Sequence, residues 1–180
     1  MANYVVSKDE TANQEVLTYG FSLILMAIAT YSTVILSALL LGVFREILIA
    51  IGTFILMRTA IGGVHAKHRA VCLITYSTVL YLSIYLSGIL RLDLYATAAL
   101  YLFNIIILIL YAPGDTVEQP MVKNRMLRKI SGLFLVTILF ALSIFVRDMR
   151  IETNIILFVS TLTSILLHPF TYRIYGCERS

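Results

Sequence analysis

The sequence is poor in charged residues. Aspartate, glutamate, lysine and arginine make up 13% of its 180 residues, whereas a soluble domain typically contains about 25%. Hydrophobic residues make up 59% of the chain, and its mean hydropathy is +0.90. The length alone would allow one soluble domain, so the distribution of the apolar residues has to decide the fold class.

Several other features are missing. There is no proline- or glycine-rich linker and no internal repeat, so we treat residues 1–180 as one domain. The two cysteines, Cys72 and Cys177, are too few for a disulfide framework, and we interpret each as a free thiol. The N-terminal segment MANYVVSKDETANQE has three acidic residues and one lysine, whereas a signal peptide begins with a basic region and a short apolar core. We therefore expect the first apolar run to remain as a helix.

The runs without a charged side chain have lengths that suit membrane spans, since a helix crosses the bilayer core with about 20 apolar residues. Five long runs cover residues 16–44, 70–90, 94–114, 130–146 and 153–172. A sixth run, residues 47–57, reaches only about 16 Å as a helix; it either continues through Arg58 or is re-entrant. We predict an all-α, polytopic integral membrane helical bundle, with five long spans plus one short or re-entrant segment.

Lysine and arginine are distributed unevenly over the two sides of this bundle. With six spans and a cytoplasmic N-terminus, ten of the 14 cationic side chains fall on the inner side, as the positive-inside rule favours. If residues 47–57 do not cross, the N-terminus changes side, but the later loops can keep theirs. We therefore expect residues 58–69 and 115–129 at the cytoplasmic face.

The segment RTAIGGVHAKHRAVC, residues 58–72, concentrates polar chemistry at the start of an apolar run. A cysteine is nucleophilic as the thiolate, and in general apolar burial raises the pKa of a thiol whereas nearby cations lower it. Two histidines and two cations precede Cys72 within seven residues: His65, Lys67, His68 and Arg69. This is the setting of a nucleophilic cysteine; the alternative is a small buried side chain packed between helices.

Two histidines compete as the base for Cys72. On a continuous helix, His68 shares a face with the cysteine four residues later and can contact it; otherwise it is an interfacial histidine. His65 precedes the cysteine by seven residues, about 10 Å along a helix axis, which is beyond hydrogen-bond reach. It can be the base only if the chain folds back or a second subunit supplies one partner. Gly62 and Gly63 offer a break before it, or they allow close helix packing.

A polar loop, APGDTVEQPMVKNRMLRK, occupies residues 112–129. Pro113 disfavours helix at the residue before it, so we expect the preceding helix to end near Tyr111. The cations of this loop either set the topology and contact lipid headgroups, or they receive an acidic peptide or a carboxylate. They are Lys123, Arg125, Arg128 and Lys129.

Two motifs resemble the AgrB family, the accessory gene regulator membrane peptidases of Gram-positive bacteria. Residues 58–72 match that family's arginine, its Gly-Gly-x-His-Ala element and its cysteine seven residues after the histidine. YAPGDTVEQP, residues 111–120, is similar to its Tyr-Ala-Pro…Thr…Pro loop. The resemblance implies a multi-pass protein of the bacterial cell membrane, with a cysteine endopeptidase site at the cytoplasmic face. It implies Cys72 as nucleophile and favours His65 over His68 as base.

The resemblance also implies a substrate and a reaction. Cys72 would cleave the C-terminal part of an AgrD-type quorum-sensing pro-peptide through an acyl-thioester, and promote closure of a thiolactone or lactone ring. The acidic tail of such a peptide would contact the basic stretch of residues 123–129. We expect membrane lipids and a homodimeric partner, and no cofactor, metal or nucleic acid.

Further residues have candidate roles in that reaction. Backbone N–H groups near Gly62 and Gly63 could bind an oxyanion. Arg58 either anchors a carboxylate or the loop, or is a charge that ends an apolar segment at the interface. Asp115 either orients His65 or is a turn residue after Pro113 and Gly114.

A different class of function stays open, because ionisable residues at membrane depth do not specify chemistry. In a small multi-span transporter or membrane scaffold without catalytic activity, His65, His68 and the cations would line a path or bind lipid. A glutamate-dependent intramembrane protease is disfavoured, since no long apolar run contains an acidic residue.

Overall fold

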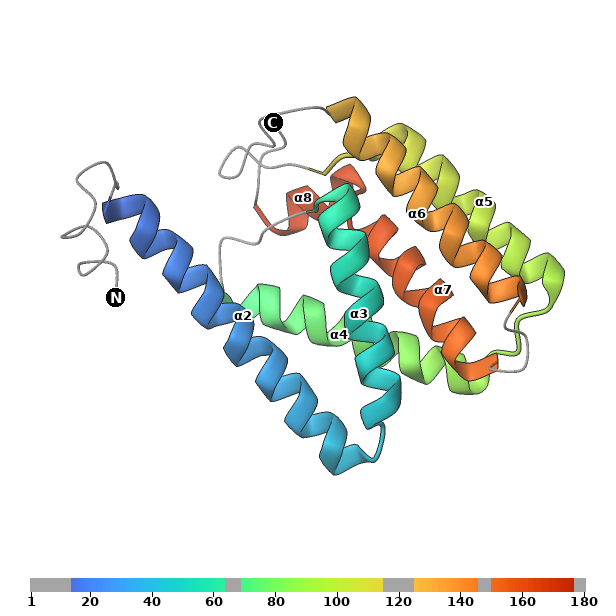
Figure 1. Cartoon of the computed structure of the whole chain (residues 1–180), viewed down its shortest axis with the longest axis horizontal. Coiled ribbons are helices and arrows are strands. Elements are labelled where there is room, and N and C mark those ends of the chain that lie inside the picture. Colours follow the sequence, from blue (N-terminus) through green and yellow to red (C-terminus); the bar gives the residue numbers. More distant parts are fainter. Residues whose placement is uncertain (1–13, 64–68, 115–124, 146–149, 177–180) are drawn as a thin grey trace. The chain divides into compact units, whose positions relative to one another are not determined.

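The computed structural model describes residues 14–63, 69–114, 125–145 and 150–176 (Figure 1). Within these ranges the secondary structure is helical and contains no strand. The chain divides into two compact units, residues 1–44 and residues 45–180. The helices are α2 (Gln14–Leu41), α3 (Phe44–Ile61), α4 (Arg69–Ile89), α5 (Leu94–Tyr111), α6 (Arg125–Phe145), α7 (Arg150–Ile165) and α8 (Pro169–Ile174).

The helices confirm the all-α prediction and support a membrane location. In the part of the chain that the structure describes, α4, α5 and α6 are each long and apolar enough to cross a membrane. Shorter apolar stretches lie in α2, at Ala27–Leu41, and in α7, at Ile151–Ile165. The short run of residues 47–57 lies within α3, whose 18 residues correspond to about 27 Å of helix. The number of spans stays a prediction.

The last apolar run, residues 153–172, is not one continuous helix; whether it crosses the membrane stays a prediction. Helix α7 ends at Ile165 and α8 begins at Pro169. A proline disfavours helix at the residue before it and suits the first helical position. His168, in an extended conformation, caps the new helix: its Nδ1 accepts the N–H of Phe170 at 3.3 Å. The absence of charged residues gives no sign of this break, which Pro169 indicates.

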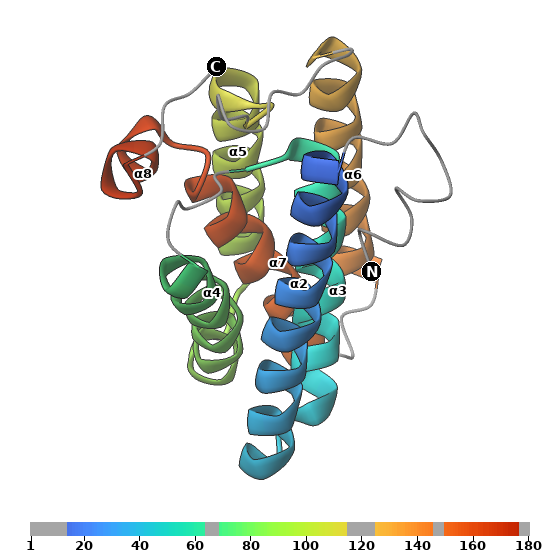
Figure 2. The same cartoon turned by 90° about the vertical axis from the view of Figure 1, so that its left-hand side faces the viewer.

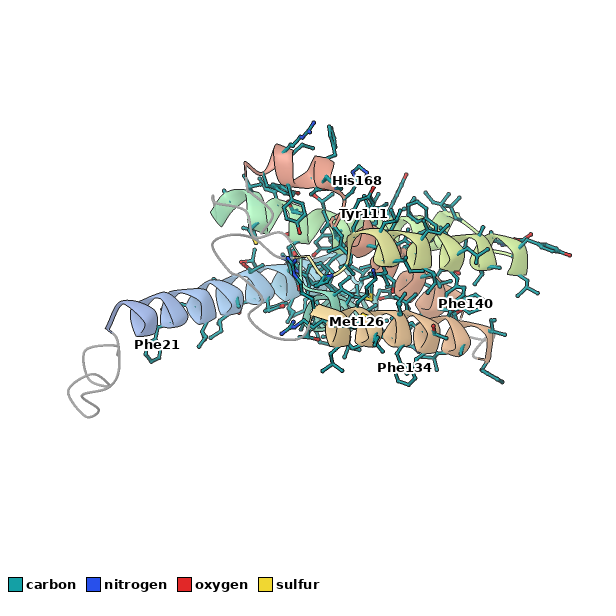
Figure 3. All side chains as sticks on the ribbon, turned by 90° about the horizontal axis from the view of Figure 1, so that it is seen from above. Phe21, Tyr111, Met126, Phe134, Phe140 and His168 are labelled. Atoms are coloured by element: carbon teal, nitrogen blue, oxygen red, sulfur yellow. The ribbon has the colours of Figure 1, made fainter. Side chains whose placement is uncertain are left out.

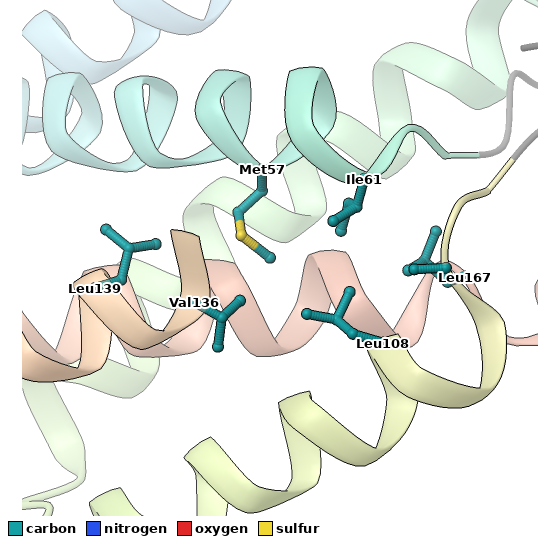
Figure 4. Close-up of a cluster of buried hydrophobic side chains, with 7 residues drawn as sticks. Met57, Ile61, Leu108, Val136, Leu139 and Leu167 are labelled. Atoms are coloured by element: carbon teal, nitrogen blue, oxygen red, sulfur yellow. The ribbon is translucent and has the colours of Figure 1, made fainter. Parts of the chain in front are cut away.

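Helix α7 is central to the second unit. It packs against α4, α5 and α6, and α5 and α6 lie side by side (Figures 1 and 2). A buried apolar cluster joins α3, α5 and α6 to the end of α7 (Figure 4). Its members are Met57, Ile61, Leu108, Ala112, Val136, Leu139 and Leu167. Gly132 lets α6 approach α3 closely, because a Cβ at this position would collide with Ile61.

A buried polar cluster connects α5 to α7. Asn104 is 2% exposed, and its Nδ2 donates to Thr161 Oγ1 at 2.9 Å and to Leu100 O at 2.8 Å. Its Oδ1 accepts the hydroxyl of Ser164 at 2.7 Å. Between helices in lipid, apolar burial supplies little driving force, so packing and interhelical hydrogen bonds hold the helices together. We infer that Asn104 fixes the register of α5 on α7.

Replacing Asn104 by leucine should weaken this contact. The substitution removes both bonds to α7, and interhelical bonds of this kind contribute about 0.6–2 kcal/mol in membranes. We expect Asn104→Leu to lower the thermal unfolding midpoint of the detergent-solubilised protein. Thr163→Val is the matched control, because the Thr163 hydroxyl bonds only its own helix, at Val159 O. Equal midpoints for Asn104→Leu and the control would contradict the assignment.

Candidate functional site

The described residues include only some of the predicted site. Arg58, Gly62, Gly63, Cys72, Arg125, Arg128 and Lys129 lie within them. Both candidate bases, His65 and His68, lie outside, as do Asp115, Lys123 and Cys177. The distance from either histidine to Cys72, and the role of Asp115, therefore stay predictions.

Helix α4 begins at Arg69, and Cys72 is its fourth residue, in the first turn. Its side chain is half-buried and its thiol is free. The first four N–H groups of a helix have no partner within the helix, and they point towards its N-terminal end. The cysteine thus lies where an α-helix presents backbone donors, which is a suitable place to stabilise a developing negative charge.

The two glycines before this helix adopt conformations that end α3. Gly62 has φ +74° and Gly63 has φ +152°, values that side chains with a Cβ rarely adopt. Helix α3 ends at Ile61 and α4 begins at Arg69. The predicted break at Gly62 and Gly63 is therefore confirmed, and no continuous helix runs from Gly62 to Cys72.

The carbonyl groups at the end of α3 are satisfied mainly by other elements. The last four carbonyls of a helix need external partners. Arg58 O accepts the N–H of Gly62 at 3.0 Å, and Ile61 O accepts the N–H of Gly114 at 2.9 Å. Arg128 Nη1 of α6 donates to Thr59 O at 3.3 Å. Ser131 Oγ donates to Arg128 O at 2.9 Å within α6 and lies 3.5 Å from Ala60 O.

These bonds join the two motifs that are about 50 residues apart in the sequence. Gly114 donates to Ile61, and its own carbonyl accepts the N–H of Gly63 at 3.0 Å, so the two segments form a short parallel bridge. A Cβ on Gly114 would lie 3.0 Å from the Cα of Gly63, so the approach requires glycine. The N–H groups of Gly62 and Gly63 are both engaged; binding an oxyanion with them would require these bonds to open.

Arg58 packs over this bridge. A Cβ on Gly63 would lie 2.9 Å from Arg58 Cζ, so the guanidinium occupies the space beside the glycine. Its Cζ also lies 5.7 Å from the ring centroid of Phe54, and Phe54 meets Tyr76 of α4 edge to face, at 4.9 Å between ring centroids. Tyr76 follows Cys72 by one helical turn. The Arg58 side chain thus packs between Gly63 and Phe54; its roles in anchoring a carboxylate or the loop stay predictions.

The basic stretch at the start of α6 also acts on helix ends. Arg128 donates to α3, and Lys129 Nζ donates to Ile109 O in the last turn of α5. A cation at a helix C-terminus interacts favourably with the helix dipole. Arg128 and Lys129 therefore have a structural role beside the predicted contact with an acidic peptide.

Sequence reasoning missed three aromatic residues near the site. The His168 ring packs edge to face on Tyr111, with centroids 5.1 Å apart (Figure 3). Tyr172 is buried, and a Cβ on Gly114 would lie 2.9 Å from its Oη. Tyr175 forms a 2.6 Å hydrogen bond with Thr75 in α4. A signal was present in HPFTYRIY, where a histidine, a proline and two tyrosines interrupt an apolar run.

Metal chemistry has no visible basis in this part of the protein. Among the residues that the structure describes, no three histidine, cysteine, aspartate or glutamate side chains are close enough to hold a metal ion. The arrangement instead offers a thiol, backbone donors and a rigid glycine bridge.

A side chain at residue 63 should disrupt the bridge. Gly63→Ala forces a Cβ into the space of the Arg58 guanidinium and strains a backbone at φ +152°; such strain costs about 1–3 kcal/mol. We expect a lower unfolding midpoint in detergent. Gly52→Ala in α3 is the control, because nothing lies within 4 Å of a Cβ there. Gly63→Ala with an unchanged midpoint would rule out this account of the bridge.

Removing the donor of residue 128 should loosen the end of α3. Arg128→Met keeps the length of the side chain but leaves Thr59 O without this donor, at an expected cost of about 1 kcal/mol for an exposed charged bond. We expect a lower unfolding midpoint and faster amide exchange at residues 62 and 63, measured by hydrogen–deuterium exchange. The control is Arg173→Met, at an exposed cation of α8. Unchanged exchange in Arg128→Met would argue against the cap.

Comparison with known proteins identifies the family. The profile of the family described as Accessory gene regulator B matches residues 1–171. A Clostridium acetobutylicum protein named as AgrB-like is 28% identical over 162 residues, which cover 89% of this chain and 77% of that protein. No solved structure matches the chain. With the match extending over nearly the whole chain, the protein belongs to the accessory gene regulator B family, whose members are membrane proteins that process quorum-sensing pro-peptides of the AgrD type.

Proposed function

We propose that this protein is a membrane cysteine endopeptidase that cleaves an AgrD-type pro-peptide and promotes its cyclisation. The observation that carries the proposal is the position of Cys72. Its half-buried thiol lies in the first turn of α4. The segment before this helix follows Gly63, whose N–H donates to Gly114 O. The segment between Gly63 and Arg69, which contains both histidines, therefore begins and ends at positions that the fold defines.

His65 is the proposed base. A continuous helix would separate it from Cys72 by about 10 Å. Helix α3 ends at Ile61, before His65, and residues 64–68 lie outside the described residues. The proposal therefore requires the chain to fold back between His65 and Cys72. His68 remains the rival within the same segment, and a second copy of the chain in a homodimer is the other source of a base.

The proposed reaction proceeds in two transfers. His65 accepts the thiol proton, and the thiolate attacks the scissile carbonyl carbon. The C–N bond then breaks, the imidazolium returns its proton to the leaving amine, and the acyl group remains on Cys72 as a thioester. A cysteine thiol or serine hydroxyl within the peptide attacks this thioester, closes the ring and releases the Cys72 thiolate. Holding that nucleophile close to the thioester favours ring closure over hydrolysis.

The oxyanion of each step needs preorganised donors. The N–H groups of the first turn of α4 are the proposed source, because they have no partner within the helix and adjoin the thiol. Gly62 and Gly63 contribute instead by fixing where the preceding segment begins, since their N–H groups already donate to carbonyls.

The basic stretch around α6 is the proposed receiver of the acidic C-terminal tail of the peptide. Arg128 and Lys129 donate to helix carbonyls, yet their charge acts on a tail over a Debye length of about 8–10 Å. Lys123 and Arg125 begin the same stretch. Salt should weaken this attraction more than it weakens the chemical step.

Replacing the nucleophile tests the proposal directly. Cys72→Ala removes the only atom that can carry the acyl group in this mechanism, so we expect cleavage to fall below detection and the thioester to disappear. The assay is co-expression with an AgrD-type pro-peptide, followed by mass spectrometry of the peptide and of Cys72. Expression of the variant should match the wild type.

The matched control is Cys177→Ser, which changes the other cysteine and should leave cleavage intact. If Cys72→Ala still cleaves the peptide, the peptidase proposal is wrong. The chain would then be better described as a transporter or a scaffold for another enzyme.

A further inference from the structure

The C-terminal segment of the described chain contacts both sides of the candidate site. It comprises α8 and Tyr175, and Tyr172 and Tyr175 follow the last residue of the family match, residue 171. Figure 2 shows α8 beside the beginning of α4, and the bond between Tyr175 and Thr75 joins these two segments. This segment lies outside the two family motifs, residues 58–72 and 111–120.

One of these contacts is with the glycine bridge. Tyr172 is 3% exposed, and its Oη lies 2.9 Å from where a Cβ on Gly114 would be. Leu167 packs on the same glycine, with its Cδ2 at 2.5 Å from that position. Gly114 is the residue that bonds Ile61 and Gly63. The C-terminal segment therefore supports the end from which the segment with His65 departs.

The other contact reaches the peptide that precedes the cysteine. Thr75 Oγ1 donates its single proton to Val71 O at 2.8 Å. Either hydroxyl can donate in the 2.6 Å contact between Thr75 Oγ1 and Tyr175 Oη; with Thr75 donating to Val71 O, the tyrosine is the donor. The result is a chain of hydrogen bonds from Tyr175 through Thr75 to the carbonyl of Val71, whose carbon is bonded to the nitrogen of Cys72.

We propose that the C-terminal segment is a latch, in which Tyr175 is a positioning residue for Cys72. It contacts Gly114 through Tyr172, and through Tyr175 it bonds Thr75, which in turn bonds Val71 O in the first turn of α4. The segment thereby fixes the first turn of α4, which carries Cys72, relative to Gly114. The hydroxyl of Tyr175 acts through Thr75 and touches no reacting atom. The tests of this inference that measure kcat rest on the proposed function; the test by alkylation of Cys72 does not.

Hydroxyl-specific variants test the latch in the full-length protein. In vesicles with the AgrD-type pro-peptide, we expect Tyr175→Phe to lower kcat about threefold to tenfold with KM unchanged, because one neutral hydrogen bond is lost. Thr75→Val loses that bond and the bond to Val71 O, so we expect at least the same loss, and Thr75→Ser should restore wild-type kcat. The double variant should be no slower than Thr75→Val, since both break the same chain.

A second readout does not depend on cleavage. In a Cys177→Ser background, a loosened first turn of α4 exposes the half-buried thiol, so we expect Tyr175→Phe to raise the rate of Cys72 alkylation by iodoacetamide threefold or more. The control is Tyr85→Phe, at an exposed tyrosine farther along α4. The unfolding midpoint of each variant shows whether the fold is intact.

The outcomes separate the two proposals. Wild-type kcat and alkylation rate in Tyr175→Phe would overturn the latch while leaving the peptidase untouched. Additive losses in the double variant, or a lower midpoint that accounts for the whole loss of activity, would also overturn it. Cleavage by Cys72→Ala would overturn the peptidase, whereas a raised alkylation rate in Tyr175→Phe would still support the latch.

Discussion

The structure around the site depends on satisfying the carbonyl groups at the end of α3. The last four carbonyls of a helix have no partner within it. Gly62, Gly114 and Arg128 donate to three of these carbonyls in α3. Gly114 follows α5 and Arg128 belongs to α6, so both of these parts of the chain stabilise the end of α3.

This constraint explains why the two motifs contain glycine. Gly62 ends the helix with a positive φ, and Gly63 and Gly114 approach each other too closely for a Cβ. Arg58 fills the space that Gly63 leaves, and Leu167 and Tyr172 fill the space around Gly114. The glycines are thus a structural support for the neighbouring thiol, and their N–H groups serve the bridge.

The position of Cys72 relates the glycine bridge to the proposed reaction. The thiol lies at the N-terminal end of α4, and the tyrosines of the C-terminal segment link that end to Gly114. The proposed peptidase would need water to be scarce and its groups to be prearranged. Arg128 and Lys129 also stabilise this region, because they cap α3 and α5, the helices that carry the two motifs.

The sequence by itself determined the helical class, the membrane character and the family, because apolar run length and short local motifs survive in any tertiary arrangement. It also indicated the break at Gly62 and Gly63, since glycine acts locally on the backbone. Only the tertiary structure decided that Gly114 bonds the Gly62–Gly63 segment, that Arg128 caps α3, and that Tyr175 reaches Thr75. Hydrogen bonds between residues 50 to 100 positions apart leave no periodic trace in one sequence, because any of several polar side chains could make them.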